Sequence, residues 1–269
     1  MSLWSNWEFD PGVVIPLALS AALYATGARR QVGLKYSRRV CFWAGWLSLV
    51  LALVSPLHPL GEELFSAHMV QHEILMLVSA PLLVISRPLV TFLWALPFEW
   101  RRSLGRWSKT QPIHASWIWL TAPLTAWWIH ALAIWIWHAP PMMDAALRSD
   151  LMHTAQHLSF LLSALLFWWA LFYAHGRRAY GSGVLYIFTT ALHTGILGAL
   201  LTFTPHAWYA PYANTTQQYG LIPLQDQQIG GLIMWVPASI IYIVAGLYLF
   251  AMWMRESDAL LERGIRAAK

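Results

Sequence analysis

The chain has 269 residues, of which 58% are hydrophobic, 14% are aromatic and only 11% are charged. An ordinary soluble domain carries about 25% charged residues, so this composition excludes a typical soluble globular enzyme. The single cysteine, Cys41, excludes a disulfide framework and any paired-cysteine metal or redox motif. We therefore expect an all-α integral membrane protein that forms a single domain over residues 1–269.

Seven apolar segments are long enough, or nearly long enough, for a helix to cross the roughly 30 Å of hydrocarbon in a bilayer. In chain order they are residues 11–27, 40–56, 64–86, 116–138, 151–174, 184–204 and 229–254. The sequence thus predicts a bundle of seven transmembrane helices with the lipid bilayer as its surroundings.

The positions of the basic residues predict the orientation of this bundle. Sixteen of the 17 Lys and Arg residues lie in segments 28–39, 87–115 and 175–183 and in the tail after residue 254, and these connections all fall on one side. Of the basic residues, only Arg148 lies on the opposite side. By the positive-inside rule the N-terminus is outside and the C-terminus is cytoplasmic. Because topology explains the basic charge, no nucleic-acid partner is expected.

Two predicted spans begin with the same histidine pattern, H-x-x-Q-H. Residues four apart on a helix share a face, so each pair can direct two imidazoles the same way. Both spans enter the membrane from outside, which places the pairs at matching depth. Four neutral imidazoles on two facing helices are a plausible metal site. The residues concerned are His68, Gln71 and His72 in the third span and His153, Gln156 and His157 in the fifth.

Other residues extend this predicted site. We add His138 and His193 as candidate ligands, and Met69 as a possible soft ligand for a cuprous ion. Glu73 is the only formally charged residue within the spans. We expect Glu73, Gln71 and Gln156 to support the ligands or to take part in a proton transfer. The other histidines are interpreted as polar residues that contact water, headgroups or carbonyls: His58, His114, His130, His175 and His206.

The second and third, fourth and fifth, and sixth and seventh spans form three hairpins that run in the same direction. Each hairpin has a polar cluster where its second span re-enters from outside. In the third hairpin this cluster contains Asp226 and Gln227. If the hairpins are structural repeats, these two side chains should lie beside the histidine site as supporting or proton-linked groups.

Spacing alone leaves three functions open. A four-residue offset rises only about 6 Å along a helix, which excludes two stacked haems but permits one bis-histidine haem in a membrane electron carrier. An intramembrane zinc hydrolase would need an open position on the metal and also remains possible. The third function is a metal-binding protein without turnover.

Five segments carry a resemblance to a known family. They are HMVQHE at 68–73, WHAP at 137–140, HTAQH at 153–157, HTGILGAL at 193–200 and DQQIGGLIMW at 226–235. Over about residues 40–255 the chain resembles the multi-span CtaG family of cytochrome oxidase assembly factors.

The resemblance implies a multi-pass protein of the bacterial plasma membrane that is needed to mature a haem-copper oxidase, by assisting copper insertion into its catalytic subunit. A histidine site near the outer surface could receive copper from an extracytoplasmic donor and pass it to that subunit. Copper(II) heads the affinity order for nitrogen ligands, although imidazoles accept zinc as well. We expect a copper-binding assembly factor that is not an enzyme.

Overall fold

The computed structural model describes residues 6–174 and 180–267, and all regular secondary structure in this part of the chain is helical, with no strand. The all-α prediction is therefore confirmed. The α-helices before the middle of the chain are α1 (Pro11–Arg30), α2 (Tyr36–Leu53), α3 (Leu57–Glu63), α4 (Phe65–Glu73), α5 (Ala80–Ser86), α6 (Pro88–Ala95), α7 (Phe98–Trp107) and α8 (Gln111–Leu120). They are followed by α9 (Pro123–His138), α10 (Pro140–Arg148), α11 (Asp150–Trp169), α12 (Tyr180–Phe203) and α13 (Pro223–Ala267).

Five helical segments are long and apolar enough to cross a membrane. They are Pro11–Arg30, Phe65–Ser86, Asp150–Tyr173, Tyr180–Phe203 and Pro223–Ser257. Two bent pairs of helices qualify only when each is taken as one span: α2 with α3, bent by 43°, and α8 with α9, bent by 64°. The protein is thus a membrane protein with five to seven spans, and each of the seven predicted segments overlaps one of these helices or pairs.

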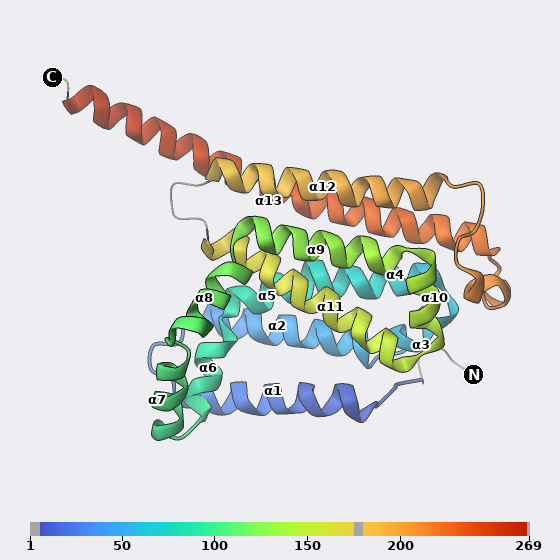
Figure 1. The fold of residues 1–269 in the computed structure, drawn as a ribbon, viewed down its shortest axis with the longest axis horizontal. Helices are drawn as coiled ribbons and strands as arrows, with labels where there is room; N and C mark the ends of the chain where they lie inside the picture. The colour runs from blue at the N-terminus through green and yellow to red at the C-terminus, as the bar shows by residue number, and fades with distance from the viewer. Residues whose placement is uncertain (1–5, 175–179, 268–269) are drawn as a thin grey trace.

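The two ends of the bundle differ in the segments that they carry (Figure 1). At one end, which we call the histidine end, lie the start of α1, helices α3 and α10, and the connection between α12 and α13. At the other, the arginine end, lie α6, α7, α8 and the connection between α1 and α2. The basic segments 28–39 and 87–115 therefore gather at one end, as the charge pattern predicted. His175 and the arginines of 175–179 lie outside the described residues.

The third span is continuous but irregular. A π-helical stretch, Ile74–Ser79, joins α4 to α5, and a second one, Ala170–Ala174, extends α11. A π-helix leaves backbone carbonyls without their usual α-helical partners, and such stretches are frequent near functional sites. The indole of Trp168 donates to the carbonyl of Met76 at 2.8 Å. This hydrogen bond connects the two irregular spans at positions that follow the predicted histidine pairs along the chain.

The short helix α3 is held by the connection between α12 and α13, which contains two 3-10 turns, Ala210–Asn214 and Thr216–Tyr219. Tyr212 donates its hydroxyl to the carbonyl of Gly61 at 2.9 Å, and Thr215 donates to the carbonyl of Glu63 at 2.6 Å. The side chains of Gln218 and Tyr219 also donate to the carboxylate of Glu63. The third hairpin thus fixes a helix of the first hairpin at the histidine end.

The first helix packs closely on α6 near the arginine end. A Cβ added at Gly27 would lie 1.9 Å from the carbonyl oxygen of Thr91, so only glycine permits this approach. We predict that Gly27→Ala forces the two helices apart and destabilises the protein by about 1–3 kcal/mol or more, as overpacking does. The measurement is the unfolding temperature of the detergent-solubilised protein.

Gly105→Ala is the matched control for Gly27→Ala. Apart from its own helix, no described part of the chain lies within 4 Å of a Cβ built at Gly105, which is in the interior of α7. Because glycine costs roughly 0.5–1 kcal/mol relative to alanine inside a helix, this variant should be neutral or slightly more stable. Equal unfolding temperatures for the two variants would contradict the close packing of α1 on α6.

Candidate metal centre

The two predicted histidine pairs come together. The rings of His68 and His72 on α4 have centroids 4.3 Å apart, and those of His153 and His157 on α11 are also 4.3 Å apart. Across the two helices, His68 stacks on His153 at 5.2 Å, and His72 lies 5.3 Å from His157. The four rings, which we call the histidine cluster, are all buried.

The cluster contains polar atoms that no protein group satisfies. Five of its buried ring nitrogens have no hydrogen-bond partner among the residues that the structure describes: Nδ1 of His68, both nitrogens of His72, Nε2 of His153 and Nε2 of His157. Each buried polar group without a partner costs about 1–3 kcal/mol. A set of converging, unpartnered imidazoles fits a metal ion, because each neutral ring has one unprotonated nitrogen whose lone pair can bind the ion instead.

A glutamine fixes the protonation of one candidate ligand. Oε1 of Gln156 lies 3.2 Å from Nε2 of His68, while the amide nitrogen of Gln156 donates to the sulfur of Met143 at 3.7 Å. With this amide orientation, Nε2 of His68 carries the proton and donates to Gln156. Nδ1 of His68 is then unprotonated and free to bind a metal. A hydrogen-bond partner on the other ring nitrogen commonly fixes the protonation of a metal-binding histidine in this way. Gln156 thus contacts one histidine of the cluster, and its role in supporting a metal ligand stays a prediction.

His58 on α3 also joins these rings. It stacks on His153 with a centroid distance of 5.1 Å and lies 5.9 Å from His157. The amide nitrogen of Gln71 approaches Nδ1 of His58 at 3.1 Å and donates to the carbonyl of Ala52 at 2.8 Å. From the sequence, His58 is predicted to be an interfacial polar residue, because nothing in its spacing links it to either pair. Only the turn into α3 brings it to the cluster.

The ligand atoms of these five histidines fall into two groups of three. In the first, His58, His153 and His157 each offer an atom within 4.8 Å of the others. In the second, His68, His72 and His157 do the same. His157 therefore belongs to both groups, and we call them the outer triad and the inner triad because His58 is partly exposed whereas His68 and His72 are almost completely buried.

A nitrogen–sulfur pair lies next to the inner triad. The ring of His138 is 5.9 Å from that of His72. Its Nδ1 lies 2.7 Å from the carbonyl oxygen of Ile134, and because a carbonyl can only accept, Nδ1 must carry the proton. Nε2 then presents a lone pair 3.4 Å from the sulfur of Met69. Two facing acceptors of this kind, one of them a thioether, suit a soft ion such as copper(I).

Other residues named from the sequence lie elsewhere. The ring of His193 is 5.3 Å from that of Trp127, and its Nδ1 accepts from the indole of Trp135 at 3.3 Å. No ring contact joins His193 to the cluster within the described parts of the chain. Glu73 forms no hydrogen bond or ion pair with the cluster there, and its Oε2 is buried without a partner.

The polar residues of the third hairpin have contacts that explain them structurally. Asp226 is fully buried and accepts hydrogen bonds from the backbone nitrogens of Phe65 and Ser66, at 2.6 and 3.1 Å, and from the hydroxyl of Ser66 at 2.5 Å. It thereby caps the N-terminus of α4 from a different helix. Gln227 accepts from the backbone nitrogen of Trp208 at 2.6 Å. Asp226 and Gln227 thus hold elements next to the cluster, and within the described residues neither forms a hydrogen bond with its rings.

A family model of the cytochrome c oxidase caa3 assembly factor, Caa3_CtaG, matches residues 22–256. The chain belongs to this family. The match confirms the resemblance found in the sequence, and it extends across the helices that carry both histidine triads. The description of the family is that of an assembly factor of cytochrome c oxidase caa3.

Three curated relatives come from mycobacteria and are uncharacterized proteins. The relatives of Mycobacterium bovis and Mycobacterium tuberculosis are each 25% identical over 274 residues, and that of Mycobacterium leprae is 25% identical over 280 residues. The alignments cover 97% of this chain but only 41% of each relative. The chain thus spans less than half the length of these relatives. No solved structure matches it.

Proposed function

We propose that this protein assists the assembly of a haem-copper oxidase by binding copper at the histidine cluster and promoting its insertion into the catalytic subunit. The proposed orientation has seven spans, with the histidine end outside the bacterial plasma membrane and the arginine end in the cytoplasm. An extracytoplasmic copper donor would then reach the cluster from the aqueous side. Family membership supports the assembly role.

The observation that carries the copper proposal is the set of five buried imidazole nitrogens without partners. Copper(II) binds imidazole more tightly than other divalent first-row ions do. The adjacent pair of His138 and Met69 adds a thioether, which favours copper(I) over zinc. Copper is cargo in this proposal, so ligands that can be exchanged two or three at a time serve better than one closed shell of four.

The contacts between the rings argue against the alternative of a haem-based electron carrier. A bis-histidine haem needs its macrocycle between two axial rings. Here His68 and His153 stack directly, with their planes 15° apart. A haem would have to push α4 and α11 apart, which would also separate packed helices on either side of the cluster.

The proposal is tested by the metal content and absorption spectrum of the purified protein. We expect the wild type to bind about one copper per chain after loading and removal of excess metal, and His72→Ala/His157→Ala to bind little. His193→Ala is the matched control and should retain copper, because this imidazole contacts tryptophans rather than the cluster. In cells, the double variant should fail to restore oxidase activity to a strain that lacks the protein.

Other outcomes would overturn this proposal. Normal copper content in the double variant would show that the histidine cluster is not the site. Equimolar zinc that excludes copper would favour a zinc enzyme, and a Soret band would favour a haem carrier. Retention of copper by the double variant together with normal oxidase activity would leave the histidines as structural residues.

A further inference from the structure

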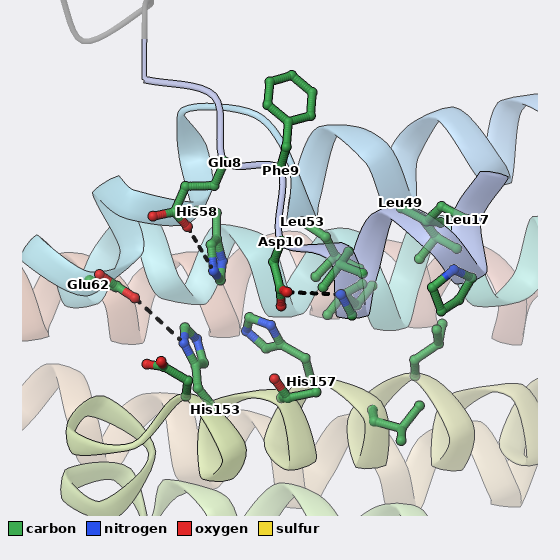
Figure 2. Close-up of a pocket in the computed structure, with 18 residues that line it drawn as sticks. Glu8, Phe9, Asp10, Leu17, Leu49, Leu53, His58, Glu62, His153 and His157 are labelled. Carbon is green, nitrogen blue, oxygen red and sulfur yellow. Dashed lines mark hydrogen bonds and ion pairs between the residues drawn. The ribbon is translucent and has the colours of Figure 1, made fainter.

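A cavity of about 830 Å³ leads to the outer triad. Its wall is formed by the segment that begins α1, the ends of α2 and α3, and one face of α11. Figure 2 shows His58, His153 and His157 pointing into this space from two sides. His153 and His157 are 6% and 7% exposed, and the Nε2 atom of each has no partner within the described residues.

Carboxylates surround the exposed part of the same cavity. Glu8, Asp10, Glu62 and Asp150 all line it and are all exposed, and neither lysine nor arginine occurs among its lining residues. Two of these carboxylates reach the histidines directly. Glu8 lies 3.4 Å from Nε2 of His58, and Glu62 lies 3.9 Å from Nδ1 of His153. A concave site lined by a single sign of charge concentrates ions of the opposite sign.

The backbone holds these carboxylates in place. The backbone nitrogen of Glu8 donates to the carbonyl of Val54 at 3.1 Å, which attaches the segment before α1 to the end of α2. Asp10 caps α1 through the backbone nitrogen of Gly12 at 2.9 Å. Glu62 is on α3, which the connection between α12 and α13 anchors. The carboxylates around the cavity, which we call the acidic rim, are therefore not positioned by flexible surface side chains alone.

We propose that this cavity is the access route for the metal cation, and that the ion moves from the outer triad to the inner triad through the shared ligand His157. This inference rests on the proposed copper-binding function. The carboxylates would collect the cation, and His58, His153 and His157 would bind it first. Rotation of the ion toward His68 and His72 would keep His157 as a ligand throughout, so that copper never leaves imidazole coordination.

The sharing of His157 has a consequence for stoichiometry. Because both triads require this one ring, a single ion is expected to occupy either triad, and wild-type protein should bind about one copper. Ligands that belong only to the outer triad should then affect how fast copper is bound more than how much is bound. Ligands of the inner triad should affect the amount.

The test measures the rate of loading and the final content separately. The solubilised full chain is mixed with cupric ion supplied as its glycine complex, the reaction is stopped at set times with EDTA, and protein-bound copper is counted. In Glu8→Gln/Glu62→Gln/Asp150→Asn we expect the loading rate to fall at least tenfold and to lose its dependence on ionic strength. His58→Ala should also load at least tenfold more slowly, and both variants should reach one copper per chain.

Glu99→Gln is the matched control for the rim. This exposed carboxylate is on α7 at the arginine end and does not line the cavity, so its loading rate should equal that of the wild type. If the triple variant and His58→Ala both load at the wild-type rate while wild type binds one copper, the access route is wrong and the copper-binding proposal stands. If His58→Ala loads at the normal rate but ends with less copper, His58 is a resident ligand and the transfer between triads is wrong. If wild type binds no copper, the proposed function itself fails.

Discussion

A His72→Leu variant is expected to be more stable than the wild type without copper and to lose the stabilisation that copper confers. His72 is 1% exposed, its ring packs 4.5 Å from that of Phe160, and neither of its nitrogens has a partner in the described structure. Leucine fills a similar space without a polar atom. Because a buried unpartnered polar group costs about 1–3 kcal/mol, the metal-free variant should gain free energy of unfolding of this order.

Copper should reverse the ranking of the two proteins. A ligand that binds only the folded state adds about 2.7 kcal/mol at a free concentration one hundred times its Kd. The wild type should show this gain, and His72→Leu should show little of it. The measurement is the unfolding temperature of both proteins in chelator and in buffered copper.

His130→Leu is the control for the same substitution at a satisfied histidine. His130 is equally buried, but its Nδ1 lies 3.0 Å from the hydroxyl of Ser163. Removing this ring should not stabilise the metal-free protein and should leave copper binding intact. A loss of stability in metal-free His72→Leu would contradict the interpretation of His72 as a ligand held at a cost to the fold.

Asp226→Ala is expected to cause the largest loss of stability of any single change considered. Its carboxylate accepts from two backbone nitrogens and one hydroxyl at the start of α4. Alanine would leave three buried donors without an acceptor, at about 1–3 kcal/mol each. We expect a fall in unfolding temperature and in the amount of folded protein in membranes, with loss of copper because α4 carries His68 and His72.

Two further variants separate this structural role from a role at the metal. Asp226→Asn retains one acceptor oxygen and should lose less stability than Asp226→Ala. Adding Ser66→Ala to Asp226→Ala removes one of the orphaned donors, so the double variant should be more stable than the sum of the single effects. An Asp226→Ala protein that unfolds at the wild-type temperature but binds no copper would instead support the sequence-based expectation of Asp226 beside the histidine site.

Part of the candidate site could be predicted because it depends on local geometry. The four-residue spacing of each histidine pair places both rings on one helix face whatever the rest of the chain does. The similar depth of the pairs follows from the hydropathy of the two spans. The amide of Gln156 is close to His68 because it occupies the same turn of α11 as two candidate ligands, His153 and His157.

Other residues could not be predicted because their contacts join distant parts of the chain. His58 enters the outer triad only because α3 bends by 43° away from the direction of α2. His193 lies at a predicted depth but faces the tryptophans of α9. Asp226 is 161 residues from the backbone nitrogen of Phe65 to which it bonds, and no periodicity reports such a distance.

The sequence by itself determined the helical class, the approximate spans, the charge asymmetry between the two ends and the presence of paired imidazoles, since these depend on composition and on the repeat of a single helix. Only the tertiary structure decided which way each helix is rotated and what packs against it. Those choices depend on the packing of whole side-chain surfaces, such as the close approach at Gly27 and the cap from Asp226. This packing places His157 in both triads and His58 beside it. It also leaves a cavity with acidic walls next to these two histidines.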